Sequence, residues 1–209
     1  MEQQLQIMLD LQNDMNTKVH SDWRQQNFAW YRAIWIECAE MLDHYGWKWW
    51  KKQTPDLEQV TLELIDIWHF GLSILLLDNV SAKSIARQLD EPLSQKTDNP
   101  KAQNQFAVEL ERFVEATLQS KKFSVRGFAQ LMSSIELSFE QLYSGYIGKN
   151  VLNFFRQNNG YQSGSYQKLW QGREDNEHLV ELAASLDHSA LDYKDQLYQA
   201  LNQRYREIL

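Results

Sequence analysis

The sequence predicts an all-α fold, and three observations lead to that prediction. Only 8 glycines and 3 prolines interrupt its 209 residues, which leaves room for long helices and few tight turns. Apolar residues recur three and four positions apart, as on the buried face of a helix. No stretch keeps the alternating apolar and polar pattern of a half-buried strand. We therefore expect a helical bundle that folds as a single domain over residues 1–209.

The first part of the chain predicts consecutive helices separated by recognisable end signals. The first helix covers about residues 2–19. The second follows a Ser-Asp pair at 21–22, which is typical of an N-cap, and stops near Gly46, since glycine is favoured just past a helix end. The third opens at Thr-Pro-Asp, 54–56, as an N-cap followed by proline in the first turn, and runs to about Leu77.

A polar insertion is expected around residues 78–104, because Ser, Asn, Asp, Gln and Pro dominate its sequence. We expect one short helix at 81–90 within it, and a mobile subregion over about 78–125. Residues 161–172 are expected to form a loop with short extended pieces. Further helices are expected at about 105–120, 124–143, 145–158, 174–186 and 190–208.

Composition excludes several classes of function. The net charge is −7, whereas binding duplex DNA requires a clustered excess of Lys and Arg, so we expect no nucleic-acid partner. The most apolar run, residues 65–77, contains Asp66 and His69 and is short for a bilayer span of about 20 residues, so we expect no membrane partner. Cys38 is the only cysteine and no signal peptide is evident, which fits the cytoplasm.

Two pairs of carboxylates lie among apolar residues on neighbouring helices. Glu37 and Glu40 are three residues apart on the second helix, and Glu63 and Asp66 repeat that spacing on the third. Antiparallel packing of the two helices would bring the four together, and each pair at ~4 Å would repel by about 4 kcal/mol at an effective dielectric near 20. Such a cluster needs protons, basic residues or metal ions, and an all-oxygen ligand set favours Mg²⁺ or Mn²⁺.

Two other interpretations of these carboxylates remain open at this point. Both pairs could be ordinary solvated helix faces, which is the common fate of such spacing. A di-iron bundle would need a Glu-x-x-His motif on each of two helices, and only Asp66 to His69 comes near it.

A row of donors marks the later part of the chain. Lys149, Asn153 and Arg156 fall at i, i+4 and i+7, so one helix face could either meet phosphates or simply face water. Lys168, Arg173 and Asn176 could extend this row. The run Trp47–Lys52 could stack on a nucleobase, or pack as an apolar loop on the core.

Five blocks carry a resemblance to a known family: LQNDMN, ECAEMLDHYGWKWWK, LELIDIWHF, GKNVLNFFRQNNGY and YQKLWQGREDN. In this order they resemble the dimeric all-α dUTPase family, part of the wider MazG-like all-α NTP pyrophosphatase superfamily. The paired carboxylates are shared across that superfamily. The tryptophan-rich loop and the fourth block narrow the resemblance to dUTPases.

The resemblance implies a role for each matching residue. The implied metal ligands are Glu37, Glu40, Glu63 and Asp66. The implied base and sugar contacts are Gln12, Asn16, Trp49, His69, Phe70, and either Asn150 or Asn153. The implied phosphate and sugar contacts are Lys149, Arg156, Tyr161, Lys168 and Asn176.

The resemblance also implies the reaction, in which water hydrolyses dUTP, and often dUDP, to dUMP with the aid of two or more Mg²⁺ ions. One ion would lower the pKa of a bound water, and Glu40, or else Glu37, would orient or deprotonate that water. A homodimer is implied as well. The alternatives are a related pyrophosphatase that prefers dCTP or has a broad housecleaning role, and a catalytically silent helical interaction protein.

Overall fold

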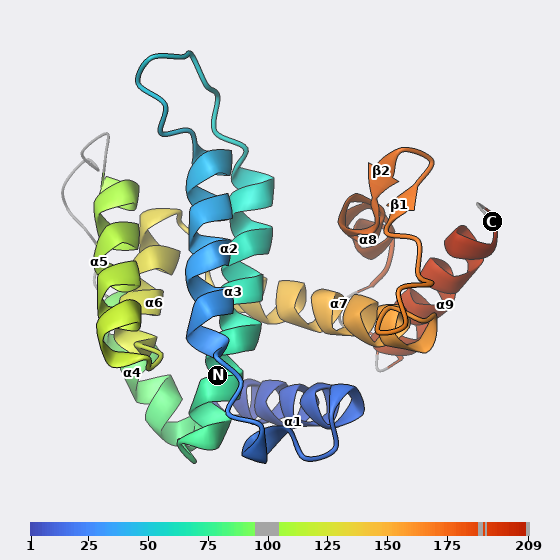
Figure 1. Ribbon diagram of the computed structural model, residues 1–209, viewed down its shortest axis with the longest axis horizontal. Helices are drawn as coiled ribbons and strands as arrows, with labels where there is room; N and C mark the ends of the chain where they lie inside the picture. Colours follow the sequence, from blue (N-terminus) through green and yellow to red (C-terminus); the bar gives the residue numbers. More distant parts are fainter. Residues whose placement is uncertain (95–104, 188–189, 191, 208–209) are drawn as a thin grey trace.

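The computed structural model describes residues 1–94, 105–187, 190 and 192–207, and its centre is a pair of antiparallel helices. These are α2 (Trp30–Tyr45) and α3 (Leu57–Leu77), which pack side by side along their length (Figure 1). The fold is all-α as predicted, with only a two-stranded hairpin besides the helices in the described residues.

The other helices form groups on either side of this pair (Figure 1). The elements concerned are α1 (Glu2–Val19), α4 (Ala82–Ser94), α5 (Gln105–Ser120), α6 (Val125–Ser134), α7 (Phe139–Asn158), α8 (Asp175–Ala184) and α9 (Tyr193–Arg206). Helices α4, α5 and α6 pack together on one side of the pair. On the other side α7 contacts α1 and α3, and its far end carries α8 and α9. Helix α7 therefore connects the central pair to the C-terminal elements.

A short hairpin precedes α8. Strands β1 (Leu169–Trp170) and β2 (Arg173–Glu174) pair in antiparallel fashion, which agrees with the short extended pieces expected there. Gln171 and Gly172 link them with φ angles of 52° and 82°. Two consecutive positive φ angles define a type I′ turn, the connection that matches the natural twist of two strands.

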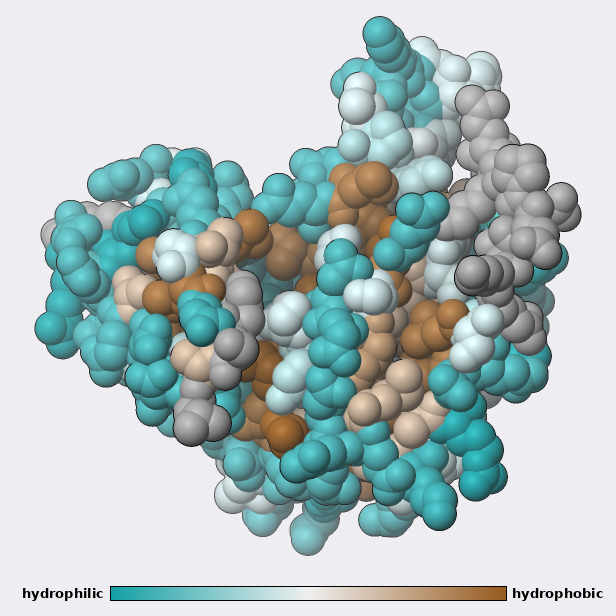
Figure 2. Space-filling model, turned by 180° about the vertical axis from the view of Figure 1, so that it is seen from behind, coloured by the Kyte–Doolittle hydropathy of each residue, from teal (hydrophilic) through white to brown (hydrophobic). Residues whose placement is uncertain are grey.

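Helix α3 is the core helix. Its length and composition would suffice for a membrane span, but 67% of that window is buried inside the fold. The apolar run at 65–77 is thus part of a longer helix, and packing against the neighbouring helices explains why that helix is apolar. Seen from behind, hydrophobic residues lie between two hydrophilic flanks (Figure 2).

Three expected helix starts were wrong, each for a local reason. Asn27 adopts a φ of 52°, so the segment after Asp22 forms only a 3₁₀ turn (Trp23–Gln25) and α2 begins later. Asp56, and not Thr54, caps α3, and it does so by accepting a hydrogen bond from the Gln59 N–H.

The third wrong start is that of α7. The break between two helices that was expected near residue 144 is found at residues 135–138 instead. There Glu136 has a φ of 60°, and Ser138 forms a capping box with Gln141 that starts α7.

The expected polar insertion is partly helical. Helix α4 extends beyond 81–90 because Ala82, Ile85, Leu89 and Pro92 form one buried stripe at helical spacing. Helix α4 contacts α1 and α6. Residues 95–104, the rest of the expected insertion, lie outside the described residues.

The close approach at Gly71 gives a stability prediction. A Cβ at this α3 position would lie 2.5–2.7 Å from three ring carbons of buried Phe123. We expect Gly71→Ala to lower the free energy of unfolding by about 1–3 kcal/mol through overpacking, although alanine is the better helix former. Urea denaturation would measure this.

Gly148→Ala is the matched control, because its Cβ would meet Leu179 and Leu197 at an ordinary 3.9 Å. The free energy of unfolding of this variant should stay the same or rise by up to about 1 kcal/mol. Equal losses in both variants would contradict the packing argument.

Candidate active site

A cavity of about 740 Å³ opens between the central helix pair and the far end of α7. Helix α1 forms one wall, α2 and α3 a second, and α7 with the β-hairpin and the start of α8 a third. The residues expected from the sequence that line it are Gln12, Asn16, Glu37, Glu40, Glu63, Asp66, His69, Phe70, Lys149, Asn153, Arg156, Tyr161, Lys168 and Asn176. The structure thus brings together residues from five separate sequence blocks.

The carboxylates meet across the α2–α3 contact. Glu37, Glu63 and Asp66 each offer an oxygen within 4.8 Å of the others. Glu40 lines the same cavity one turn further along α2 but lies outside this group, and its side chain is exposed. His44 Nε2 lies 3.5 Å from a Glu63 oxygen. Three of the four expected metal ligands are therefore already close enough to share an ion.

Crowding changes the acidity of this group. Burial, with the negative charge of Asp66 and a hydrogen bond to Glu63 adding to it, raises the pKa of Glu37 to about 9. Burial likewise raises the pKa of Glu63. A proton is thus retained where the carboxylates crowd together. A hard divalent cation could replace that proton, so the donor set fits Mg²⁺.

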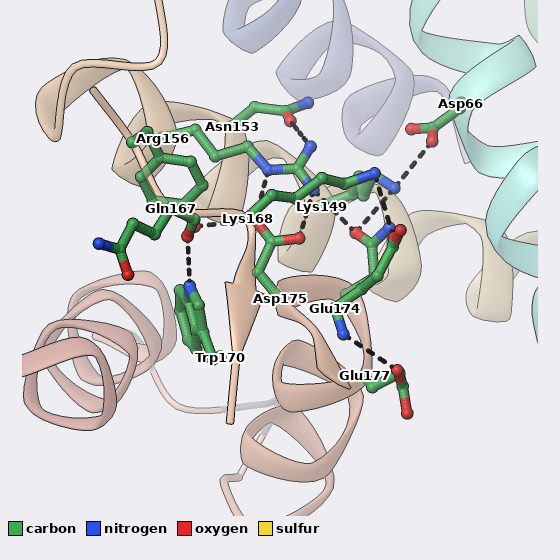
Figure 3. A network of polar contacts seen from close by, with 12 residues as sticks. Asp66, Lys149, Asn153, Arg156, Gln167, Lys168, Trp170, Glu174, Asp175 and Glu177 are labelled. Atoms are coloured by element: carbon green, nitrogen blue, oxygen red, sulfur yellow. Dashed lines mark hydrogen bonds and ion pairs between the residues drawn. The ribbon is translucent and has the colours of Figure 1, made fainter. Parts of the chain in front are cut away.

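Lys149 supplies one internal counter-charge. Its ammonium lies 2.7 Å from an Asp66 oxygen and donates to Asn176 Oδ1 at 3.0 Å, although the residue is only 2% exposed (Figure 3). Burying a lysine in this way requires a paired carboxylate. Lys149 therefore joins the acidic wall to the start of α8.

Arg156 is fixed by a residue that sequence reasoning missed. Asp175, which is fully buried, accepts from Arg156 Nε at 2.8 Å and from Nη2 at 2.6 Å (Figure 3). Tyr166 also donates to Asp175, at 2.8 Å. The available signal was its place in the REDN sequence directly before Asn176, among residues already expected at the site.

Amides and a histidine form the opposite end of the cavity. Gln12 Nε2 donates to Asn16 Oδ1 at 3.0 Å, and both amides contact the Ser73 hydroxyl. Gln12 Oε1 lies 2.8 Å from His69 Nδ1 and also accepts from Tyr146 Oη at 3.1 Å. An amide oxygen only accepts, so His69 carries its hydrogen on Nδ1.

His69 is held neutral and leaves one atom unused. Burial lowers its pKa to about 4. The ring stacks on Tyr146 with centroids 4.2 Å apart, and buried Nε2 has no hydrogen-bond partner among the described residues. With the hydrogen on Nδ1, Nε2 is a buried acceptor of a residue that lines the cavity.

Two expected residues do not line the cavity. Trp49 is 90% exposed, at the tip of the loop between α2 and α3. Asn150 is buried inside α7 on the side of Tyr146. Of the two asparagines left open by the sequence, Asn153 is the one that faces the cavity.

These features define a class: an all-α protein whose cavity sets a carboxylate cluster against a row of cations, as an enzyme acting on nucleotide phosphates requires. A search of curated proteins finds no match. A family model described as dUTPase matches residues 4–161. The chain belongs to this dimeric all-α dUTPase family, whose members are hydrolases of nucleotide metabolism that act on the pyrophosphate bonds of dUTP.

The raised pKa of Glu37 predicts how stability depends on pH. Between about 4.5 and 9 the folded chain holds a proton that the unfolded chain has lost, so the free energy of unfolding of the metal-free protein should fall as pH rises. We expect Glu37→Gln to flatten this slope and to raise the Tm at pH 8 in EDTA by at least about 2 °C.

Thermal unfolding across this pH range checks the prediction, and Glu58→Gln, at an exposed position of the neighbouring helix α3, is the control. Equal slopes in the wild type and Glu37→Gln would show that the carboxylate cluster is not protonated in the folded state.

Proposed function

We propose that this chain hydrolyses dUTP, and also dUDP, to dUMP in a Mg²⁺-dependent reaction within the cavity described above. One observation carries the proposal: the carboxylates of Glu37, Glu63 and Asp66 line the same cavity as Arg156 and as Lys149, which contacts Asp66. A nucleotide's phosphate chain needs cations on every side, and the row on α7 supplies only part of them. The family relationship supports the same substrate.

Glu37, Glu63 and Asp66 would hold the Mg²⁺ ions, and Glu40 would join them or stay free. A bound divalent cation supplies charge to the phosphate oxygens and acidifies the attacking water. Mn²⁺ would serve in its place, because it accepts the same oxygen ligands.

The phosphate end uses cations from two elements. Lys149 and Arg156 lie on one face of α7, and Lys168 approaches from the β-hairpin, where it now pairs with Glu174 at 3.1 Å. Their positive charges would balance the charge that develops on the departing pyrophosphate. Tyr161 and Asn176 line the same end and would add neutral donors.

Glu40 is the carboxylate we assign to the attacking water, with Glu37 as the second choice. Glu40 lines the cavity but lies outside the tight group of three, so its oxygens are not committed to the shared cation position. A carboxylate next to a polarised water can orient it and accept its proton.

The amide end would select uracil. His69 Nε2 is a buried acceptor without a partner in the described part of the chain, so it could take the N3–H of uracil, while the amides of Gln12 and Asn16 present both donors and acceptors. Cytosine has no hydrogen at N3 and would leave buried polar groups unpaired, at about 1–3 kcal/mol each. Phe70 and Asn153 line the cavity nearby and complete the set of base and sugar contacts that we propose.

A panel of nucleotides tests this function. We expect hydrolysis of dUTP and dUDP in Mg²⁺, none in EDTA, and at least about 100-fold lower kcat/KM for dCTP and dTTP. Release of dUMP would be followed by chromatography. A preference for dCTP would favour the related pyrophosphatase, and inactivity on every nucleotide would favour a non-enzymatic helical protein.

Glu63→Ala is the sharpest variant for the metal assignment. Losing one carboxylate of the shared group should lower kcat/KM for dUTP by at least about 100-fold while the fold is retained, as judged by circular dichroism. Glu58→Ala, on the exposed side of the same helix, is the matched control. Full Mg²⁺-dependent turnover by Glu63→Ala would refute the ligand assignment.

We further propose that the protein is a cytoplasmic homodimer. Trp49 and Trp50, whose ring centroids lie 5.5 Å apart, are 90% and 57% exposed, and exposed apolar surface of this kind is typical of an interface. Sedimentation equilibrium should give about twice the chain mass of 24.8 kDa, and Trp49→Ser with Trp50→Ser should shift the protein towards monomer. A monomer at all concentrations would refute the dimer.

A further inference from the structure

Both carboxylate oxygens of Asp175 accept hydrogen bonds from other side chains of the protein. It is the first residue of α8 and is 0% exposed. Oδ2 accepts from Arg156 Nε and from Tyr166 Oη, both at 2.8 Å, and Oδ1 accepts from Arg156 Nη2 at 2.6 Å. This two-point pairing fixes the plane of the guanidinium as well as its charge.

Tyr166 is itself held in place. Its ring stacks on Tyr205 at 5.3 Å with the planes 27° apart, so its hydroxyl has a fixed direction. The backbone N–H of Asp175 donates to the carbonyl of Lys168 at 3.0 Å. The carboxylate is therefore supported from α9 and from the hairpin, independently of Arg156.

The pairing with Asp175 leaves the other edge of the Arg156 guanidinium facing the cavity. A guanidinium has five N–H donors, and Asp175 takes one from Nε and one from Nη2. The bonds to Asn153 and Asn176 are long, at 3.3 Å each, and the second N–H of Nη1 has no partner among the described residues. A ligand could replace both amides without disturbing the ion pair with Asp175.

An arginine without this anchor would have a competing partner. Lys149 already bridges Asp66 and Asn176, and Arg156 shares Asn176 with it, so the acidic wall lies at the end of a continuous polar chain (Figure 3). A freed guanidinium can reorient along this chain towards the carboxylates. There it would oppose divalent cations and no longer face the phosphates.

We propose that Asp175, supported by Tyr166, is a positioning residue that turns the free edge of Arg156 towards the leaving pyrophosphate part of the substrate. The proposal rests on the function proposed above, in which Arg156 contacts phosphate. The same short segment also places Asn176, which holds Lys149, so one buried carboxylate orders the cations on this side of the cavity.

The test compares binding of inorganic pyrophosphate with binding of deoxyuridine, both in Mg²⁺. Asp175→Asn should weaken pyrophosphate binding by about 10–100-fold, measured by calorimetry, and change the inhibition constant of deoxyuridine by less than about twofold. Tyr166→Phe keeps the Asp175 carboxylate and removes one hydrogen bond to it. This variant should weaken pyrophosphate binding by a smaller factor. A merely structural defect would weaken both ligands together.

A double variant shows whether Asp175 acts through the arginine. The double variant that combines Arg156→Ala with Asp175→Asn should bind pyrophosphate no more weakly than the single variant Arg156→Ala does. Glu181→Gln, which removes a surface partner of Arg173 and Arg204, is the matched control and should bind both ligands as the wild type does.

The outcomes separate the two proposals. If Arg156→Ala retains pyrophosphate affinity, the phosphate role of Arg156 is wrong and the positioning role is wrong with it. If Arg156→Ala loses that affinity but Asp175→Asn keeps it, or if the two losses add, only the positioning role is overturned. Should Asp175→Asn fail to fold, an unchanged pyrophosphate affinity in Tyr166→Phe would overturn the proposal in its place.

Discussion

The mutual repulsion of carboxylates across the α2–α3 contact is the constraint on which the rest of the site depends. Glu37, Glu63 and Asp66 lie within reach of a common ion, on the two helices that also form the centre of the core. Helices packed this tightly cannot separate to relieve the repulsion without giving up apolar burial. Positive charge must therefore come to the carboxylates, and the structure brings it from α7.

This constraint explains the placement of α7. One side of the helix buries Leu152 and Phe155 in the core, and the other presents Lys149 and Arg156 to the cavity. Each cation has its own carboxylate partner, Asp66 for the lysine and Asp175 for the arginine. Buried charges are tolerated in a fold when they are paired and hydrogen-bonded in this way. The polar network is thus part of what fixes α7 relative to α3 and α8.

The sequence was sufficient for the fold class and for most of the cavity wall, because helical periodicity and i, i+3 spacing place residues on shared faces. It failed where geometry depends on single backbone angles. The left-handed residues Asn27 and Glu136 moved two helix boundaries, and neither residue type requires that conformation.

Two site features could not be derived from residue spacing. The partnership of Asp175 with Arg156 joins residues 19 positions apart through a hairpin whose turn the sequence did not reveal. Trp49 matched a family block, but the course of its loop directs it to solvent. Spacing predicts neighbours along one helix, and it does not predict where loops carry side chains.

The neutral state of His69 has a consequence for how the two ends of the cavity respond to acidity. With a pKa near 4 and its hydrogen committed to Gln12, the ring presents the same bare nitrogen from mildly acidic to alkaline solution. The carboxylate end, in contrast, holds a proton on Glu37 that is lost as the pH rises through about 9. Discrimination between bases would thus stay constant over a pH range in which binding of the triphosphate changes.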